Sequence, residues 1–167
     1  MTPRKGQRGA RFTPRRRERQ KKKKRPPDPD PLPPFPGRQP LFEGLHHVGL
    51  LVSNLERSLD FYMGTLGLPL CADRPDARLP YRGAWLWVGR EMVHLMELPS
   101  PDPTEGRPSH GGRDRHFCVG VKSVADLSAR LAAAGVPFTA SASGRPAIFF
   151  RDPDANVLEC AEMEPWR

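Results

Sequence analysis

One pattern of secondary-structure signals occurs twice in the chain, and this repeat restricts the possible folds more than any other feature. In the first copy, an apolar run at 45–52 has the length and composition of a buried strand. Ser53 and Asn54 are helix N-cap signals, and an apolar stripe over 55–66 indicates an amphipathic helix that ends at Gly67. This copy begins as a strand followed by a helix.

The second copy has the same order. A strand is expected at 115–121, Ser123 is an N-cap signal, and a helix is expected over 124–134 with Gly135 as its end. Each helix is followed by short strand signals, at 68–72, 84–88 and 92–97 in the first copy and at 137–140, 147–150 and 157–161 in the second. A strand-helix unit followed by strands, present twice, predicts an α+β fold.

The first 40 residues differ from the rest of the chain. They contain 14 Lys and Arg against 3 Asp and Glu, and 10 of the 21 prolines, but no apolar run. Such a segment cannot bury enough surface to compensate the entropy of ordering, so a disordered basic tail is predicted over 1–40. The folded domain is expected at 41–167, with modules at about 43–100 and 113–163. The basic run at 15–25 suits contact with nucleic acid, a nuclear address or a solubilising extension.

Membrane and disulfide signals are missing from the sequence. No apolar segment has the length of a transmembrane helix, so no membrane partner is expected. Cys71, Cys118 and Cys160 lie far apart and form no CxxC pair, which suits a reducing compartment. A cytoplasmic location is therefore expected, with nuclear or organellar targeting by the tail as the open alternative.

The repeat places four metal-binding side chain types at matching positions. His47 and His116 each precede their helix cap by seven residues, and His94 and Glu159 each lie on the second strand of a predicted hairpin. Glu159 would otherwise be a lone carboxylate in an apolar strand, a position that requires a partner, a proton or a metal. Histidines and a carboxylate suit Ni, Zn, Mn, Fe(II) or Co. We therefore predict a divalent metal site formed by His47, His94, His116 and Glu159.

Two neighbouring residues are weaker alternatives as ligands. His46 adjoins His47, but adjacent strand residues face opposite sides of a sheet, and only His47 keeps the register of the repeat. Glu97 is three residues from His94 and is expected on the opposite face, unless the strand twists or bulges at its end.

These residues carry a family resemblance. His47-Val48 leading to SNLERSLDFYMGTLGL, then RHFCVGVKSVADLSARLAAAGV, then GRPAIFFRDPDANVLE resemble the vicinal-oxygen-chelate superfamily, which includes glyoxalase I, fosfomycin-resistance proteins and extradiol dioxygenases. The resemblance covers about 43–163. It implies two tandem βαβββ modules that form a cup-shaped mixed sheet around a divalent metal. Within it, His47, His116 and Glu159 match the most regular ligands and His94 the more variable fourth position.

The resemblance leaves three functions open. The first is a glyoxalase I-like lyase or isomerase that acts on a small oxygenated substrate, such as the glutathione hemithioacetal of a 2-oxoaldehyde, with glutathione as co-substrate. Glyoxalase I has two glutamates at its metal, whereas this chain has His94 at the fourth position, so Glu159 is the one carboxylate base. The second is an Fe(II) extradiol-type dioxygenase with His94 as an acid or base group. The third is a small-molecule-binding protein of the resistance type, without turnover.

Candidate substrate contacts and the oligomeric state complete the predictions. Trp85 and Trp87, on one strand face, are expected either to form a wall of the cup or to pack in the core. Arg145 is the first choice for holding a carboxylate or phosphate of the substrate, and Arg82 is a second. The cup closes either within one chain or across a homodimer, in which each site takes His47 and His94 from one subunit and His116 and Glu159 from the other. The resemblance favours the homodimer.

Overall fold

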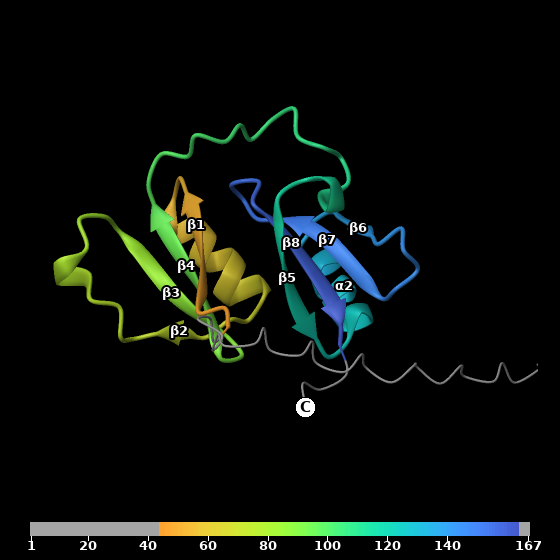
Figure 1. The fold of residues 1–167 in the computed structure, drawn as a ribbon, viewed down its shortest axis with the longest axis horizontal. Coiled ribbons are helices and arrows are strands. Elements are labelled where there is room, and N and C mark those ends of the chain that lie inside the picture. Colours follow the sequence, from red (N-terminus) through yellow and green to blue (C-terminus); the bar gives the residue numbers. More distant parts are fainter. Residues whose placement is uncertain (1–43, 164–167) are drawn as a thin grey trace, which may run out of the picture. The chain divides into compact units, whose positions relative to one another are not determined.

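Each copy of the repeat forms a four-stranded mixed sheet in the computed structural model, which describes residues 44–163 (Figure 1). The tail predicted at 1–40 lies outside the described residues. The first sheet has the strand order β1-β4-β3-β2 and the second β5-β8-β7-β6. The strands are β1 (His47–Val52), β2 (Leu70–Cys71), β3 (Gly83–Val88), β4 (Glu91–Glu97), β5 (His116–Val121), β6 (Phe138–Ala140), β7 (Ala147–Arg151) and β8 (Val157–Glu162).

The two sheets have identical connectivity. In each, the first strand pairs in parallel with the last, and the other neighbours pair antiparallel. The parallel pair needs a crossover connection, and the helix after the first strand supplies part of it. The predicted α+β fold with two repeated modules is confirmed.

The helices begin at the predicted caps. The Asn54 side chain accepts a hydrogen bond from the Arg57 amide at the start of α1 (Leu55–Leu59), and the Ser123 side chain caps α2 (Val124–Ala133). The predicted first helix continues from α1 as a π-helical segment, Asp60–Thr65, in which the Leu66 amide donates to the Phe61 carbonyl. Single 3₁₀ turns occur at Asp76–Arg78 and Gly111–Arg113.

A carboxylate from the last strand of each sheet adds a second cap to each helix. Glu97 Oε1 accepts a hydrogen bond of 2.9 Å from the Leu55 amide, and Glu162 Oε2 accepts one of 3.0 Å from the Val124 amide. These carboxylates satisfy amide groups that the first turn of a helix leaves unpaired. Glu97, at the end of β4, therefore links this strand to the start of α1 on the sheet face opposite His94.

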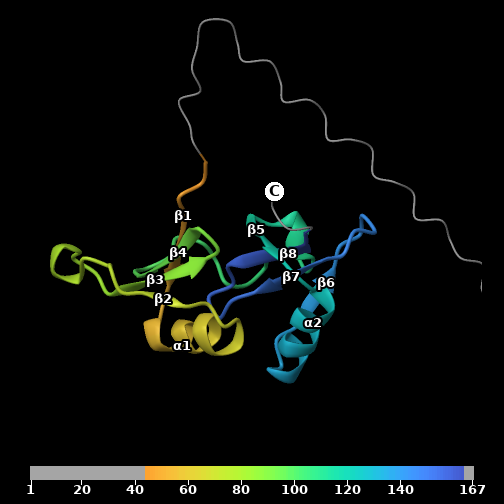
Figure 2. The same ribbon diagram turned by 90° about the horizontal axis from the view of Figure 1, so that it is seen from below.

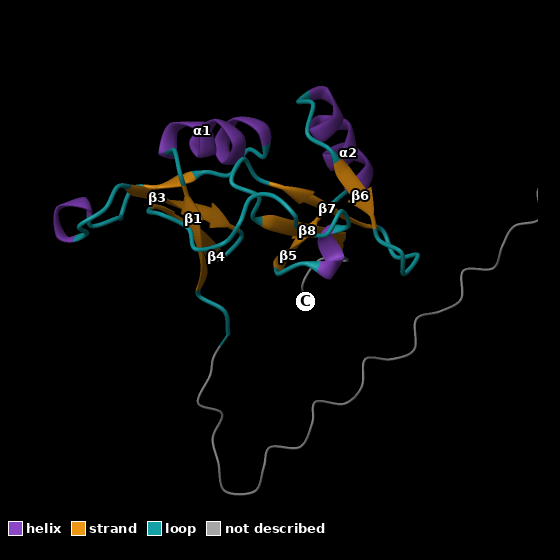
Figure 3. Ribbon diagram, turned by 90° about the horizontal axis from the view of Figure 1, so that it is seen from above, coloured by secondary structure: helices purple, strands orange, loops and turns teal. Residues whose placement is uncertain are grey.

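The helices cover the same side of both sheets, as Figures 2 and 3 show from below and above. The core lies between the helices and the sheets, and its largest fully buried side chains include Tyr62, Leu86, Leu95 and Leu131. The opposite face of each sheet carries neither α1 nor α2, and in the second sheet the short 3₁₀ turn Gly111–Arg113 packs there against β7 and β8 (Figure 3). His47 and His116 are exposed.

The turn between β7 and β8 connects the two modules. The Tyr62 hydroxyl donates to Asp152 Oδ2 at 2.9 Å, and the Ser53 amide donates to Asp154 Oδ1 at 3.0 Å. Asn156 Nδ2 donates to the Leu51 carbonyl at 3.1 Å. The acidic turn that precedes Glu159 thus forms several polar contacts between the second module and the first.

Over residues 44–163, no helix has both the length and the apolar composition needed to cross a membrane.

Candidate metal centre

The strand register gives His94 and Glu159 equivalent positions in the two sheets. His94 pairs with Gly49, which lies two residues after His47. Glu159 pairs with Cys118, which lies two residues after His116. Residues that pair across two strands, and residues two apart along one strand, point to the same face. The two predicted ligands of each module therefore lie on the sheet face opposite α1 and α2.

The first module brings His47 and His94 together in an aromatic stack. The His94 ring lies between the His47 ring, with centroids 3.9 Å apart, and the Trp85 ring, with centroids 4.3 Å apart. Only 9% of His94 is exposed, and its Nε2 has no hydrogen-bond partner. Burial, together with the nearby His47, His46 and Arg74, lowers the pKa of His94 to about 4. At neutral pH this imidazole is uncharged, as a metal ligand must be.

The second module brings His116 and Glu159 together. His116 Nε2 lies 3.1 Å from Glu159 Oε2, and Arg145 forms an ion pair with the other carboxylate oxygen. Glu159 is 4% exposed, so the carboxylate sits at the base of this half-site. His116 Nδ1 lies 2.7 Å from the Asp114 carbonyl, a contact that orients the ring and leaves Nε2 directed at Glu159.

The four predicted ligands form two pairs within one chain. Among residues 44–163, no three His, Cys, Asp or Glu side chains gather closely enough to hold a metal. Protein sites for divalent ions commonly use three or four side chains, so neither pair is sufficient by itself. Together the pairs supply three imidazoles and one carboxylate, a ligand set that fits a divalent ion. Nε2 of His94 is buried without a hydrogen-bond partner, so its lone pair is available to such an ion.

The predicted substrate residues lie in different surroundings. Trp85 faces the half-site and stacks on His94, and Trp87 is partly buried on the same face, two residues further along β3. Arg145 lies at the second half-site through its ion pair with Glu159. Arg82 instead pairs with Glu56 and Glu97 at the start of α1, so it joins β3 to the helix.

The structure adds one residue, Phe149, that was not predicted from the sequence. Phe149 pairs with Glu159 as Trp85 pairs with His94, so both half-sites have an aromatic ring at the same strand position. The repeat register contained this signal, since each aromatic residue lies on the strand that precedes its ligand in a hairpin. The alternative ligand His46 is exposed, and its Nδ1 lies 2.9 Å from Nδ1 of His47.

Comparison with known proteins identifies the family. Residues 44–160 match the family model described as Glyoxalase/Bleomycin resistance protein/Dioxygenase superfamily. The chain is 27% identical over 126 residues to Glyoxylase I 4 of Arabidopsis thaliana, covering 72% of this chain and 71% of that protein. This chain is a member of that superfamily.

Solved structures show the same fold. Lactoylglutathione lyase from Agrobacterium tumefaciens has a TM-score of 0.54 and 23% identity, and the match covers 76% of this chain and 98% of that one. A fosfomycin resistance protein from Listeria monocytogenes, solved with Mn(II) and dihydroxypropylphosphonic acid, has a TM-score of 0.59 and 20% identity, over 75% and 95% of the two chains. At these identities, the likeness establishes the fold.

Proposed function

We propose that this protein is a divalent-metal-dependent, glyoxalase I-like lyase or isomerase that works as a homodimer. Each metal site takes His47 and His94 from one subunit and His116 and Glu159 from the other. The observation that carries the proposal is the pair of half-sites at equivalent positions on the sheet faces opposite α1 and α2, of which one holds a buried imidazole nitrogen without a partner.

The substrate class follows from the relatives. Glyoxylase I 4 and lactoylglutathione lyase support a small oxygenated substrate, such as a glutathione hemithioacetal of a 2-oxoaldehyde. The Mn(II) in the fosfomycin resistance protein supports a metal in this fold. The donor set suits Ni, Zn, Mn or Fe(II).

Each residue of the site has a distinct role in this proposal. A bound divalent ion supplies Lewis-acid stabilisation of negative charge on the substrate oxygens. Glu159 is the base that takes a proton from the substrate and returns it at the neighbouring carbon. His94 is held by its two stacked rings as a neutral donor, and Trp85 forms a wall beside it. Arg145 is 56% exposed and free to turn from Glu159 towards a carboxylate of the substrate.

Metal content tests the ligand assignment. We expect the purified full-length protein to bind about one Ni, Zn or Mn per subunit, and His47→Ala, His94→Ala, His116→Ala and Glu159→Ala each to lose at least 90% of it, because removal of one ligand weakens such sites by roughly tenfold or more. The measurement is elemental analysis after dialysis. His46→Ala is the matched control and keeps its metal.

Turnover tests the reaction class. A coupled methylglyoxal and glutathione assay should show activity that requires added Ni, Zn or Mn and is lost in Glu159→Gln. Metal binding without turnover would favour a small-molecule-binding protein of the resistance type. Unchanged metal content in both His116→Ala and Glu159→Ala would contradict the proposed site itself.

A second candidate rests on three of the same residues. His47, His116 and Glu159 are two histidines and one carboxylate, the ligand set of non-haem Fe(II) oxygenases. In an extradiol-type dioxygenase, His94 would act as the acid or base group beside the site. Cleavage of catechol with Fe(II), together with inactivity towards the hemithioacetal, would select this function.

A further inference from the structure

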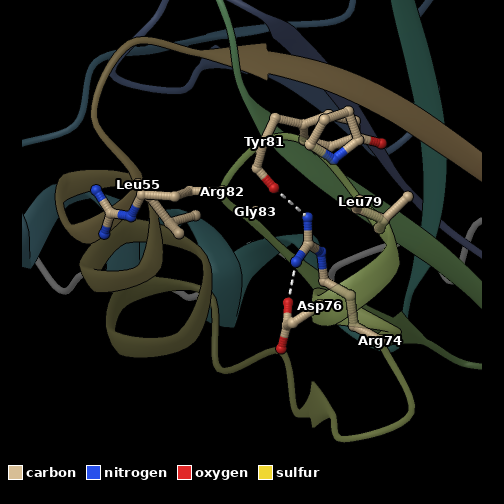
Figure 4. A pocket seen from close by; sticks show the side chains of 8 residues that line it. Leu55, Arg74, Asp76, Leu79, Tyr81, Arg82 and Gly83 are labelled. Atoms are coloured by element: carbon tan, nitrogen blue, oxygen red, sulfur yellow. Dashed lines mark hydrogen bonds and ion pairs between the residues drawn. The ribbon is translucent and has the colours of Figure 1, made fainter.

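A pocket of about 480 Å³ opens at the end of the first sheet (Figure 4), and none of the four predicted ligands is among the residues that line it. It lies between the start of α1 and the segment that joins β2 to β3. Its lining combines apolar side chains with two arginines, and consists of Leu55, Arg74, Asp76, Leu79, Pro80, Tyr81, Arg82 and Gly83. This volume lies within the range of about 300–1,000 Å³ that is common for small-molecule sites.

Arg74 is the unusual residue of this pocket. Its side chain is only 6% exposed although it carries a permanent charge. A buried guanidinium is costly unless its donors are paired. One terminal nitrogen donates to the Tyr81 carbonyl at 2.8 Å, the other contacts Asp76, and Nε has no partner. Figure 4 shows the guanidinium between the Asp76 carboxylate and the Tyr81 carbonyl.

The surrounding residues make room for this buried charge. The guanidinium carbon lies 5.5 Å from the centroid of the Tyr81 ring, within the range of a cation–π contact. A Cβ on Gly83 would lie 3.1 Å from the terminal nitrogen of Arg74 that binds Tyr81. The missing side chain at Gly83 thus leaves space for the guanidinium against β3.

Asp76 is a weakly held partner. Its side chain is 76% exposed, and it lies only two residues from Arg74 on a single 3₁₀ turn. Asp76 is thus the exposed member of the pair, and Arg74 is the buried one. A ligand carboxylate can take the place of Asp76 on the same terminal nitrogen, which keeps the buried guanidinium paired while the Tyr81 carbonyl holds the other nitrogen.

We propose that this pocket binds a small carboxylate with an apolar or aromatic body, whose carboxylate replaces Asp76 on Arg74. The present partner of Arg74 is itself a carboxylate, and the planar guanidinium matches that geometry. Leu55, Leu79 and Pro80 supply the apolar wall, and Tyr81 supplies an aromatic surface. The other arginine, Arg82, is already paired with Glu56 and Glu97.

Binding at this pocket requires no metal, so its test is made without metal. The full-length protein is treated with a chelator, and binding of 3-phenylpropionate is measured by calorimetry. Its uncharged analogue, 3-phenylpropanamide, should bind at least tenfold more weakly, because it cannot form a charge-assisted pair with Arg74.

Three variants test the role of Arg74. Arg74→Gln and Arg74→Lys should weaken 3-phenylpropionate binding roughly tenfold or more, since glutamine lacks the charge and lysine lacks the planar fork. Asp76→Asn should strengthen it, because it removes the competing charge. Arg78→Gln is the matched control on the same turn, where the arginine is exposed, and should leave the affinity unchanged.

Opposite changes in 3-phenylpropionate affinity, weaker in the Arg74 variants and stronger in Asp76→Asn, distinguish ligand binding by Arg74 from a purely structural role. If Arg74→Gln does not fold, Asp76→Asn and Arg74→Lys still decide the outcome. Unchanged or weaker 3-phenylpropionate binding in Asp76→Asn would overturn the proposal, and so would equal binding of the amide. Tighter binding of 2-phenylethylphosphonate than of 3-phenylpropionate would overturn the assignment to carboxylates.

Discussion

At the scale of single residues, the close packing around position 83 requires glycine there. A Cβ there would lie far inside contact distance of the Leu95 carbonyl, in addition to its contact with Arg74. Gly83→Ala should therefore lower the free energy of unfolding by about 1–3 kcal/mol through overpacking. Gly64 is the matched control, since nothing lies within 4 Å of its Cβ position and the residue is helical. Gly64→Ala should raise stability by about 0.5–1 kcal/mol, and urea unfolding measures both. Equal effects of the two substitutions would contradict the close packing of Gly83.

The charged carboxylate of Asp154 contributes to the stability of the fold. Burial favours its protonated form, but hydrogen bonds from the Ser53 hydroxyl and amide and from Arg57 outweigh that effect and hold its pKa below the ordinary 3.8. A carboxyl with a lowered folded-state pKa contributes stability above its unfolded pKa and loses it as the pH falls. Asp154→Asn should cost about 1–3 kcal/mol at pH 7.

The difference in the free energy of unfolding between wild type and Asp154→Asn should become smaller as the pH falls from 5 to 3, because only the wild type loses a charged carboxylate. Thermal unfolding across this range measures it. A constant difference from pH 7 to pH 3 would show that the charge of Asp154 does not contribute.

At the scale of secondary-structure elements, the two strand carboxylates that cap the helices are equivalent parts of the repeat. Glu97→Gln and Glu162→Gln should each lower the free energy of unfolding by about 0.5–2 kcal/mol, the usual range for a lost helix cap. The Glu97 variant also loses an ion pair with Arg82, so its effect should be the larger of the two. Glu91→Gln, on an exposed residue at the start of β4, serves as the control. Chemical denaturation that found neither cap variant destabilised would contradict this role.

The extent of each element was predictable, but the local geometry was not. Strong periodic patterns placed β1, β4, β5, β8 and α2 within a few residues of their observed bounds. The π-helical half of the first helix has the same apolar spacing as an α-helix, and the two differ in backbone hydrogen bonds such as that from the Leu66 amide to the Phe61 carbonyl. Likewise, the sequence placed Glu97 away from His94, but the helix amide that it caps is a tertiary contact with no local signal.

Some site residues could likewise be predicted from the sequence, and others could not. His94 and Glu159 were expected at equivalent positions because each lies on the second strand of a predicted hairpin, and the strand register agrees with this. The burial of Arg74 could not be predicted, since the segment around it is polar, contains prolines and has no periodicity. Its role depends on Gly83 and Tyr81, which the chain brings near only when the sheet forms.

At the scale of the whole molecule, the central question is how the proposed metal site is completed. Within residues 44–163 the proposed ligands form two separate pairs, and a two-fold dimer would complete both sites. Every site would then combine the first half-site of one subunit with the second half-site of its partner. The alternative is closure of both half-sites within one chain, and the two arrangements differ in how defective chains can complement each other.

Mixing two defective variants distinguishes these arrangements directly. His94→Ala lacks a working first half-site and Glu159→Ala a working second one, so neither variant alone should hold metal. In a mixed dimer, one of the two sites combines both intact halves. After unfolding and refolding an equal mixture, we predict about one quarter of the wild-type metal content, because half of the dimers are mixed and each has one complete site. Metal content that stays at the level of the separate variants, although mixed dimers form, would contradict a site shared between subunits.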